Sequence, residues 1–301
     1  MANRRIDEPT GTSTVGHEWD GIEELDTPMP RWWLWTFYAS IIFAVGYVIA
    51  YPAIPMVRKG TAGMLGWSSR GQLQHEVSEH QAALAPMLAA IGSMAIEDLP
   101  NDPARMRAAV SGGRAAFKVN CVQCHGAGAA GSKGYPNLND DDWLWGGDLK
   151  AIEYTITNGA RQPGDPQTRS SQMPAFGHDG ILTAAQVDQV AGHVLSLSGK
   201  GRDSAAGAQL FAQNCAICHG ANGTGNRQFG APNLADAIWL YGGTREDVAA
   251  QVTNPRHGAM PAWGGRLDPV TIKMLAAYVH SLGGGEDFVE AAPAAKADAA
   301  P

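Results

Sequence analysis

The chain is poor in cysteine, in basic residues and in long uncharged segments. Its 301 residues include only four cysteines, and all four belong to the motifs described below, so none is left for a disulfide framework. Lys and Arg number 22 against 29 Asp and Glu, for a formal net charge of −7. Nucleic acid is excluded as a non-specific partner, because such binding needs a basic surface that displaces counterions. The length allows about two domains, and a hydrophobic fraction of 45% suffices for packed cores.

Only one segment lacks charge over a length that spans a bilayer. No charged residue occurs from Trp32 to Val57. As a helix, the part from Trp32 to Tyr51 would rise about 30 Å, the thickness of a bilayer core, and Pro52 and Pro55 oppose its continuation. Tryptophan and tyrosine lie near both ends, as in interfacial aromatic belts. We predict an uncleaved single-span anchor at residues 32–56 in membrane lipid. The alternatives are a buried core helix and a signal peptide, which the long, acidic residues 1–31 do not resemble.

The charges beside the span point to an unusual orientation. Arg31 alone precedes it closely, whereas Arg58, Lys59 and Arg70 follow it. By the positive-inside rule, the C-terminal side would then be cytoplasmic. We set this count aside, because the cofactor inferred next is attached outside the bacterial cytoplasmic membrane. We predict an inner-membrane protein with a cytoplasmic N-terminus and periplasmic C-terminal domains.

All four cysteines lie in two copies of the motif Cys-x-x-Cys-His. The copies are Cys121-Val-Gln-Cys124-His125 and Cys215-Ala-Ile-Cys218-His219. This pattern is the attachment signal for c-type haem: two thiols add to the haem vinyl groups, and the adjacent histidine becomes the proximal iron ligand. A zinc ribbon would bring its two cysteine pairs within roughly 20 residues of each other, and a thioredoxin-like pair would need a βαβ context. We predict two covalently bound haem c groups.

The two motifs belong to an internal repeat. Glycine and phenylalanine precede the first cysteine of each motif at the same spacing, and three further segments recur in the same order downstream. The recurring segments are Pro136-Asn-Leu138 with Pro232-Asn-Leu234, Trp143–Gly147 with Trp239–Gly243, and Met173–Gly177 with Met260–Gly264. Each copy ends in a helical pattern, capped by Thr183 or by Asp268. The predicted fold is mainly α, with one N-terminal transmembrane helix followed by two tandem class I cytochrome c-like domains.

The predicted boundaries follow these patterns. Residues 1–31 form a polar cytoplasmic arm, and residues 57–110 a periplasmic connector whose helical pattern is interrupted at Pro86. Residues 111–199 form the first cytochrome domain, which carries an extra polar loop around Arg161 to Gln172, and residues 202–284 form the second. The short joint between the domains should hold them close together. The tail at 285–301, rich in alanine, proline and acidic residues, is expected to be disordered.

Each haem needs a sixth ligand if it only carries electrons. Met173 and Met260 are the only methionines at equivalent positions in both copies, and proline follows each of them. Methionine sulfur stabilises reduced iron and raises its potential, and proline stiffens the loop. The alternative is that both are core methionines. His178 and His257 lie near these positions without counterparts in the other copy, so bis-histidine ligation remains a second possibility.

Other residues are expected to support the haems. Pro136 and Pro232 follow the motif histidines by 11 and 13 residues, and the resemblance to class I cytochromes c suggests that their carbonyls orient these histidines. Trp143 and Trp239 are either propionate donors or core residues with a polar tip, and we favour the second role. His193 is interpreted as a helix-surface residue. No arrangement typical of a catalytic site occurs in the sequence, so we predict no catalytic residue.

The N-terminal segment carries the most specific resemblance. It runs His17-Glu-Trp-Asp-Gly-Ile-Glu-Glu-Leu-Asp-Thr-Pro-Met-Pro-Arg-Trp-Trp-Leu-Trp-Thr-Phe-Tyr38, followed by Gly46-Tyr47 and Tyr51-Pro52. Together with the dihaem repeat, it resembles the membrane-anchored dihaem cytochrome c subunit of cbb3-type cytochrome c oxidases, the FixP/CcoP family, from about residue 15 to residue 284.

The resemblance implies a place in an aerobic respiratory chain. The subunit would accept electrons from soluble or membrane-anchored cytochrome c. It would relay them through a monohaem cytochrome c subunit towards the haem–copper catalytic subunit, which reduces O₂ to water and pumps protons. The alternatives are a dihaem subunit of a periplasmic dehydrogenase, which should lack the N-terminal signature, a dihaem peroxidase, which needs an open iron site, and a redox sensor.

Overall fold

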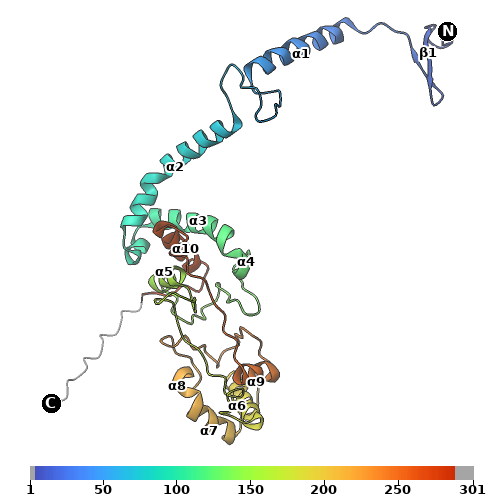
Figure 1. Cartoon of the computed structure of the whole chain (residues 1–301). Helices are drawn as coiled ribbons and strands as arrows, with labels where there is room; N and C mark the ends of the chain where they lie inside the picture. Colours follow the sequence, from blue (N-terminus) through green and yellow to red (C-terminus); the bar gives the residue numbers. More distant parts are fainter. Residues whose placement is uncertain (1–3, 289–301) are drawn as a thin grey trace. The chain divides into compact units, whose positions relative to one another are not determined.

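The computed structural model describes residues 4–288 (Figure 1). Within this range the fold is mainly helical, with one two-stranded sheet, and the predicted fold class is confirmed. The chain divides into two compact units, the first ending at Ala83 and the second beginning at Leu84.

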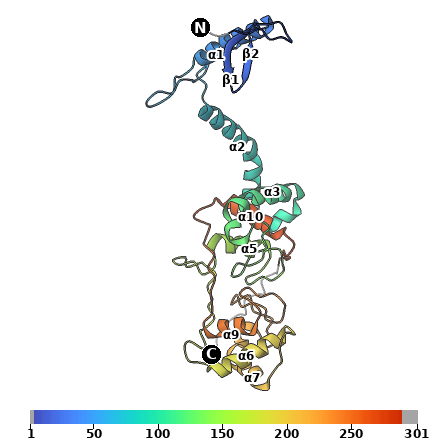
Figure 2. The same ribbon diagram turned by 90° about the vertical axis from the view of Figure 1, so that its right-hand side faces the viewer.

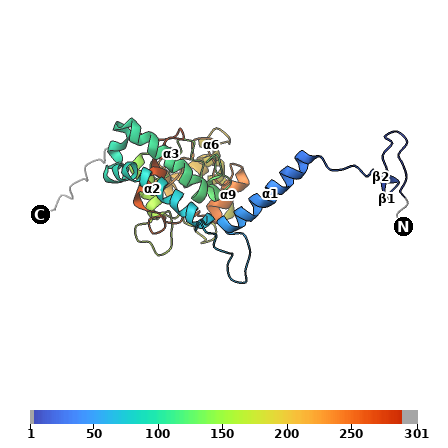
Figure 3. The same ribbon diagram turned by 90° about the horizontal axis from the view of Figure 1, so that it is seen from above.

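The first unit begins with a β-hairpin. Strands β1 (Thr14–Trp19) and β2 (Ile22–Leu25) pair antiparallel, with Trp19 opposite Ile22. Asp20 and Gly21 form the turn with φ values of 51° and 86°, as in the tight two-residue loops that suit hairpins. An extended segment, residues 26–30, joins the hairpin to the next helix (Figure 3). We predicted only a polar arm here; the Asp-Gly pair was the signal for this hairpin.

Helix α1 (Arg31–Ala50) contains 20 residues and buries none of them. Among the described helices, it alone is long and apolar enough to cross a membrane. It ends just before Pro52, so the last residues of the predicted span lie outside the helix. Helix α2 (Ser69–Ser93) runs through Pro86 without a break. The predicted interruption is wrong, because a proline removes a single backbone hydrogen bond and the turns on either side sustain the helix.

Besides the last turns of α2, the second unit contains one 3₁₀ helix and eight α-helices among its described residues. They are η1 (Ile96–Asn101), α3 (Pro103–Asn120), α4 (Val122–His125), α5 (Leu149–Asn158), α6 (Ala184–Leu197), α7 (Ala205–Asn214), α8 (Ala216–His219), α9 (Arg245–Thr253) and α10 (Pro269–His280). Side chains cap the long helices as the sequence indicates: Thr183 and Gln186 form a capping box on α6, and Asp268 caps α10.

The packed halves of this unit exchange helices between the two repeats. Helices α3 and α5 of the first repeat pack on α10 of the second, whereas α7 and α9 of the second pack on α6 of the first (Figures 1 and 2). One core therefore combines Phe117 with Leu275, and the other combines Phe211 with Val190. The ranges 111–199 and 202–284 describe repeats in sequence, but neither is a separately packed body.

The short joint explains the exchange. Helix α6 ends at Leu197 and α7 begins at Ala205, so these consecutive helices pack against each other. Helix α3 then meets α10 instead. The crossings are close at glycine: a Cβ on Gly113 would lie 1.9 Å from the carbonyl oxygen of Met274, and one on Gly207 would lie 2.4 Å from that of Gln189.

The edges of the second unit also differ from the predicted boundaries. Residue 110 falls inside α3, and Ile91 and Leu99 from the predicted connector are fully buried in the core with α10. Glu286, in the predicted disordered tail, accepts a hydrogen bond from the backbone N–H of Gly147 and pairs with Arg227. The rest of that prediction, residues 289–301, lies outside the described residues.

Candidate haem sites

Each Cys-x-x-Cys-His motif forms the end of one helix and the whole of the next. Cys121 terminates α3 and begins the single turn α4, which ends at His125. Cys215 has the same position between α7 and α8, which ends at His219. One helical turn thus holds both thiols and the imidazole of each motif together. Burial, with a smaller effect of the second thiol, raises the pKa of both leading cysteines to about 11.

A proline carbonyl orients each motif histidine. The Nδ1 atoms of His125 and His219 each lie 3.1 Å from a carbonyl oxygen, that of Pro136 and that of Pro232. Because a carbonyl only accepts, Nδ1 carries the proton and Nε2 keeps its lone pair for a metal. Burial lowers the pKa of both imidazoles, although the carbonyl partly offsets this effect. The neutral form that ligates metal is therefore favoured.

The Met260 loop belongs to the half that contains His125. The backbone of Met260 pairs with Ala160, at the end of α5. Three and four residues farther along the same loop, the N–H groups of Trp263 and Gly264 donate to carbonyls of α5. The Met260 side chain packs against the core that contains Phe117. A methionine of the second repeat thus serves the half built around the first motif.

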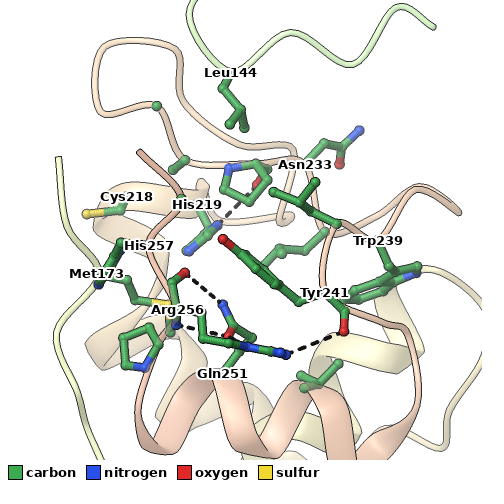
Figure 4. A pocket seen from close by; sticks show the side chains of 18 of the residues that line it. Leu144, Met173, Cys218, His219, Asn233, Trp239, Tyr241, Gln251, Arg256 and His257 are labelled. Carbon is green, nitrogen blue, oxygen red and sulfur yellow. Dashed lines mark hydrogen bonds between the residues drawn. The ribbon is translucent and has the colours of Figure 1, made fainter. Parts of the chain in front are cut away.

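The Met173 loop belongs to the half that contains His219. His178, just after this loop, donates its N–H to the carbonyl of Thr253 at the end of α9, and Gly177 packs closely on Thr253. Met173 and His219 line the same cavity, where Figure 4 shows both side chains. The arrangement mirrors that of the other half, so each motif faces the Met-Pro loop of the other repeat.

The cavity lined by Met173 and His219 fits a large, mostly apolar cofactor with a polar edge. Its volume is about 580 Å³, within the range of small-molecule and cofactor pockets. Cys215 and Cys218 lie at its wall, which is otherwise largely apolar: Phe176, Val190, Val194, Phe211, Val248 and Val252. Trp239 also lines it, and its Nε1 is buried with no hydrogen-bond partner among the described residues. An unpaired buried donor is costly, and an anionic group of a bound cofactor would satisfy it.

Trp143, the equivalent tryptophan of the first repeat, has a hydrogen-bond acceptor within the protein. Nε1 of Trp143 donates to the carbonyl of Gly284, beyond α10. The preferred prediction, a packed ring with a polar tip, therefore describes Trp143. The Nε1 of Trp239, which has no partner among the described residues, is available for the role in the alternative prediction, a donor to a haem propionate.

Of the two histidines considered as alternative iron ligands, His178 lies on the surface and His257 lies in the cavity. His178 is exposed, and its Nδ1 lies 3.0 Å from a carboxylate oxygen of Asp179. His257 lines the cavity beside Met173 (Figure 4), where burial and the charge of Arg161 lower its pKa. His257 is therefore the only one of the two that the described structure places at a haem cavity.

His193 is not the surface residue we predicted. It is 8% exposed, and its Nδ1 lies 2.7 Å from Oδ1 of Asp203. Its ring centroid lies 5.1 Å from that of Phe211, with the two ring planes tilted by 54°. The prediction failed because α6 packs on α7 of the other repeat, which covers the face that carries His193.

Charged residues of the first repeat line the cavity that contains Met173 and His219. Asp140 and Asp142 line it, and burial, together with the charges of Asp236 and Asp140, raises the pKa of Asp142 to about 6. From the extra polar loop, Arg161 also lines the cavity and donates to the carbonyl of Gly258, while burial lowers its pKa. Sequence reasoning noted the extra loop but gave these residues no role.

Comparison with known proteins identifies the family. A model described as the N-terminal domain of cytochrome oxidase-cbb3, FixP, matches residues 11–58. A second, described as cytochrome c oxidase, cbb3-type, subunit III, matches residues 108–194 and 202–279. The chain belongs to the FixP family of cbb3-type cytochrome c oxidase subunits. This FixP-family chain is thus an electron-transfer subunit of a cbb3-type oxidase, and the matches do not support the dehydrogenase or peroxidase alternatives.

Individual relatives cover nearly the whole chain. A cbb3-type cytochrome c oxidase subunit FixPc of Rhizobium leguminosarum bv. viciae is 51% identical over 95% of this chain and 100% of its own length. FixP of Rhizobium meliloti (strain 1021) is 52% identical over 94% and 99%. A CcoP subunit of Cereibacter sphaeroides is 51% identical over 92% and 97%. The matched range of the first family model contains both the hairpin and α1.

Proposed function

We propose that this FixP-family chain carries two covalent haem c groups whose ligand sets cross between the repeats. Cys121 and Cys124 would tether the haem ligated by His125 and Met260. Cys215 and Cys218 would tether the haem ligated by His219 and Met173. The observation that carries the proposal is that each motif histidine shares its half with the Met-Pro loop of the other repeat.

The protein supplies position, potential and exclusion of water. Bound haem iron exchanges single electrons between its ferrous and ferric states. The carbonyls of Pro136 and Pro232 hold the histidine rings in one tautomer and orientation. Methionine sulfur favours the reduced state, and the buried cores around Phe117 and Phe211 keep water away. None of these residues acts on a substrate, so the chain needs no active site of its own.

We place the chain in the bacterial inner membrane, with its N-terminus in the cytoplasm and both haem-bearing halves in the periplasm. Helix α1 would anchor it beside the haem–copper catalytic subunit. Electrons would enter from a soluble or anchored cytochrome c and leave through the monohaem cytochrome c subunit, towards the centre that reduces O₂ while protons are pumped. Both haem sites lie in a single compact unit, which keeps the distance for electron exchange short.

The decisive experiment is a pull-down of the tagged, detergent-solubilised chain with a reduced-minus-oxidised spectrum. Co-purified b-type haem, copper and oxygen consumption are expected if the chain is the electron-input subunit of the complex. Two low-spin c haems without b haem would overturn its place in a stable oxidase. A high-spin haem that binds CO would overturn the methionine ligand at that site.

A further inference from the structure

On one face of the N-terminal hairpin, the charged side chains pair with a residue of the same segment. Glu18 and Glu23 are directly opposite in the strand register, an arrangement of like charges that destabilises a strand pair. Arg5 resolves it: its guanidinium donates to Glu23 and lies 3.8 Å from a carboxylate oxygen of Glu18. Arg5 also donates its backbone N–H to the hydroxyl of the buried Thr14. The chain before β1 thus covers this face.

The opposite face is apolar and uncovered. Trp19 and Ile22 are paired across the strands, so their side chains lie on the same face. They are 67% and 69% exposed, and the ring of His17 lies 6.4 Å from that of Trp19. An isolated two-stranded hairpin is marginally stable in water and normally needs a third element packed on it. Within the described part of the first unit, residues 4–83, no third strand or helix packs on these two side chains, so the Trp19–Ile22 face is open to a partner.

The charge around this face selects the partner. Residues 4–30 contain seven acidic and two basic residues, for a net charge of −5. Among the described residues, four of these acids form no ion pair: Asp7, Glu8, Asp20 and Glu24. Asp20 lies between the two exposed residues in sequence, and Glu24 follows them closely. The cytoplasmic leaflet is itself negatively charged and repels such a segment. The cytoplasmic loops of multi-span membrane proteins, in contrast, are enriched in Lys and Arg.

We infer that the hairpin docks through its Trp19–Ile22 face on the basic cytoplasmic surface of the multi-span subunit beside which α1 inserts. The inference rests on the orientation and complex of the proposed function. It also accounts for the unusual flanking charges of α1. The chain itself carries few basic residues on the N-terminal side of the span, and the partner supplies the positive charge that holds an acidic segment there.

The test uses the full, tagged chain expressed in its own host. Two hairpin variants are Trp19→Ser with Ile22→Ser, and Asp20→Lys with Glu24→Lys. The matched control is Glu76→Lys with Glu79→Lys, which makes the same charge change on the exposed surface of α2. We expect each hairpin variant to retain about tenfold less b-type haem and copper per c haem than wild type or control. Unchanged c-haem content shows that the haem halves remain folded.

The outcomes separate the two claims. Wild-type chain that brings down no b-type haem would overturn the proposed complex. If the wild-type chain brings down b-type haem and the hairpin variants bring down as much of it, the docking surface alone is overturned. Variants that keep the oxidase subunits but lose co-purified anionic lipid would instead assign the face to the membrane surface. As a direct measurement, a photoreactive benzophenone side chain at position 19 should cross-link to the multi-span subunit, whereas one at position 8 should do so several-fold less.

Discussion

Met260 and Ala160, one hundred positions apart, are joined by two backbone hydrogen bonds. The N–H of Ala160 donates to the carbonyl of Met260 at 3.0 Å, and the N–H of Met260 donates to the carbonyl of Ala160 at 2.8 Å. Ala160 follows α5, the helix that packs on α10 in the half containing His125. This pair holds the Met260 loop in the half that contains His125, and the first prediction below depends on it.

The crossed ligand sets can be separated in chains that carry one haem. With Cys215 and Cys218 replaced by serine, only the first haem remains. In that background Met260→Ala should convert it to a high-spin, CO-binding haem, because its sixth ligand is lost. Met173→Ala should leave it low-spin. Optical and electron paramagnetic resonance spectra report the spin state.

The reciprocal background, with Cys121 and Cys124 replaced by serine, is the control. There the effects of the two methionine variants should be reversed. If each methionine instead affects the haem of its own repeat, the crossed assignment is wrong.

The crossing of α3 and α10 should not tolerate a side chain at Gly113. A Cβ there would lie 1.9 Å from the backbone carbonyl oxygen of Met274, which cannot move without displacing α10. Gly113→Ala should lower the free energy of unfolding by about 2–3 kcal/mol. The neighbouring Gly112→Ala is the comparison, because its Cβ would meet only the flexible end of the Met274 side chain. Urea midpoints measured through the haem spectrum should separate the variants, and equal losses would contradict the close crossing.

The two equivalent tryptophans should affect their haems unequally. Trp239→Phe removes the buried Nε1 donor that has no described protein partner. A propionate that loses this hydrogen bond places an uncompensated negative charge near the iron, which favours the ferric state. The potential of the haem at Cys215 and Cys218 should therefore fall by tens of millivolts in a spectroelectrochemical titration.

Trp143→Phe is the matched control for that titration. Its Nε1 is already occupied by the carbonyl of Gly284, so the potential of the other haem should change little. Equal shifts in both variants would show that the Trp239 donor has no special partner.

Asp142 should make stability fall as pH rises through about 6. Burial and neighbouring acids raise its pKa to about 6 in the folded chain, above the roughly 3.9 of an unfolded chain. Below the unfolded pKa of Asp142 its carboxyl is neutral in both states, so it does not destabilise the fold. Above the folded pKa the carboxyl is ionised in both states, and its burial lowers the free energy of unfolding by the full amount. Asp142→Asn should therefore stabilise the protein by about 1 kcal/mol above pH 6, after allowance for solvent screening.

The pH dependence of this gain is the diagnostic. In thermal unfolding the difference from wild type should disappear near pH 4. Asp141→Asn, at the exposed neighbouring position, is the control. A gain for Asp142→Asn that is the same at pH 4 and pH 8 would exclude titration as its cause.

Much of this protein was predictable from local pattern alone. The uncharged run predicted α1, and Pro52 marked its end, because hydrophobicity and helix termination are properties of neighbouring residues. The Cys-x-x-Cys-His spacing predicted two haem sites, because thioether attachment and axial ligation depend on residues within one helical turn. Equivalent segments in the repeats selected Met173 and Met260.

Tertiary structure alone decided how these parts combine. Sequence order suggested that each repeat folds on itself, but the short joint packs α6 on α7 and leaves α3 to α10. That pairing assigns Met260 to the half of His125 and buries His193. It also leaves the Nε1 of Trp239 without a hydrogen-bond partner among the described residues, whereas Gly284 accepts from Trp143. Such outcomes depend on which helices meet, and residues a hundred positions apart carry no local sign of their contact.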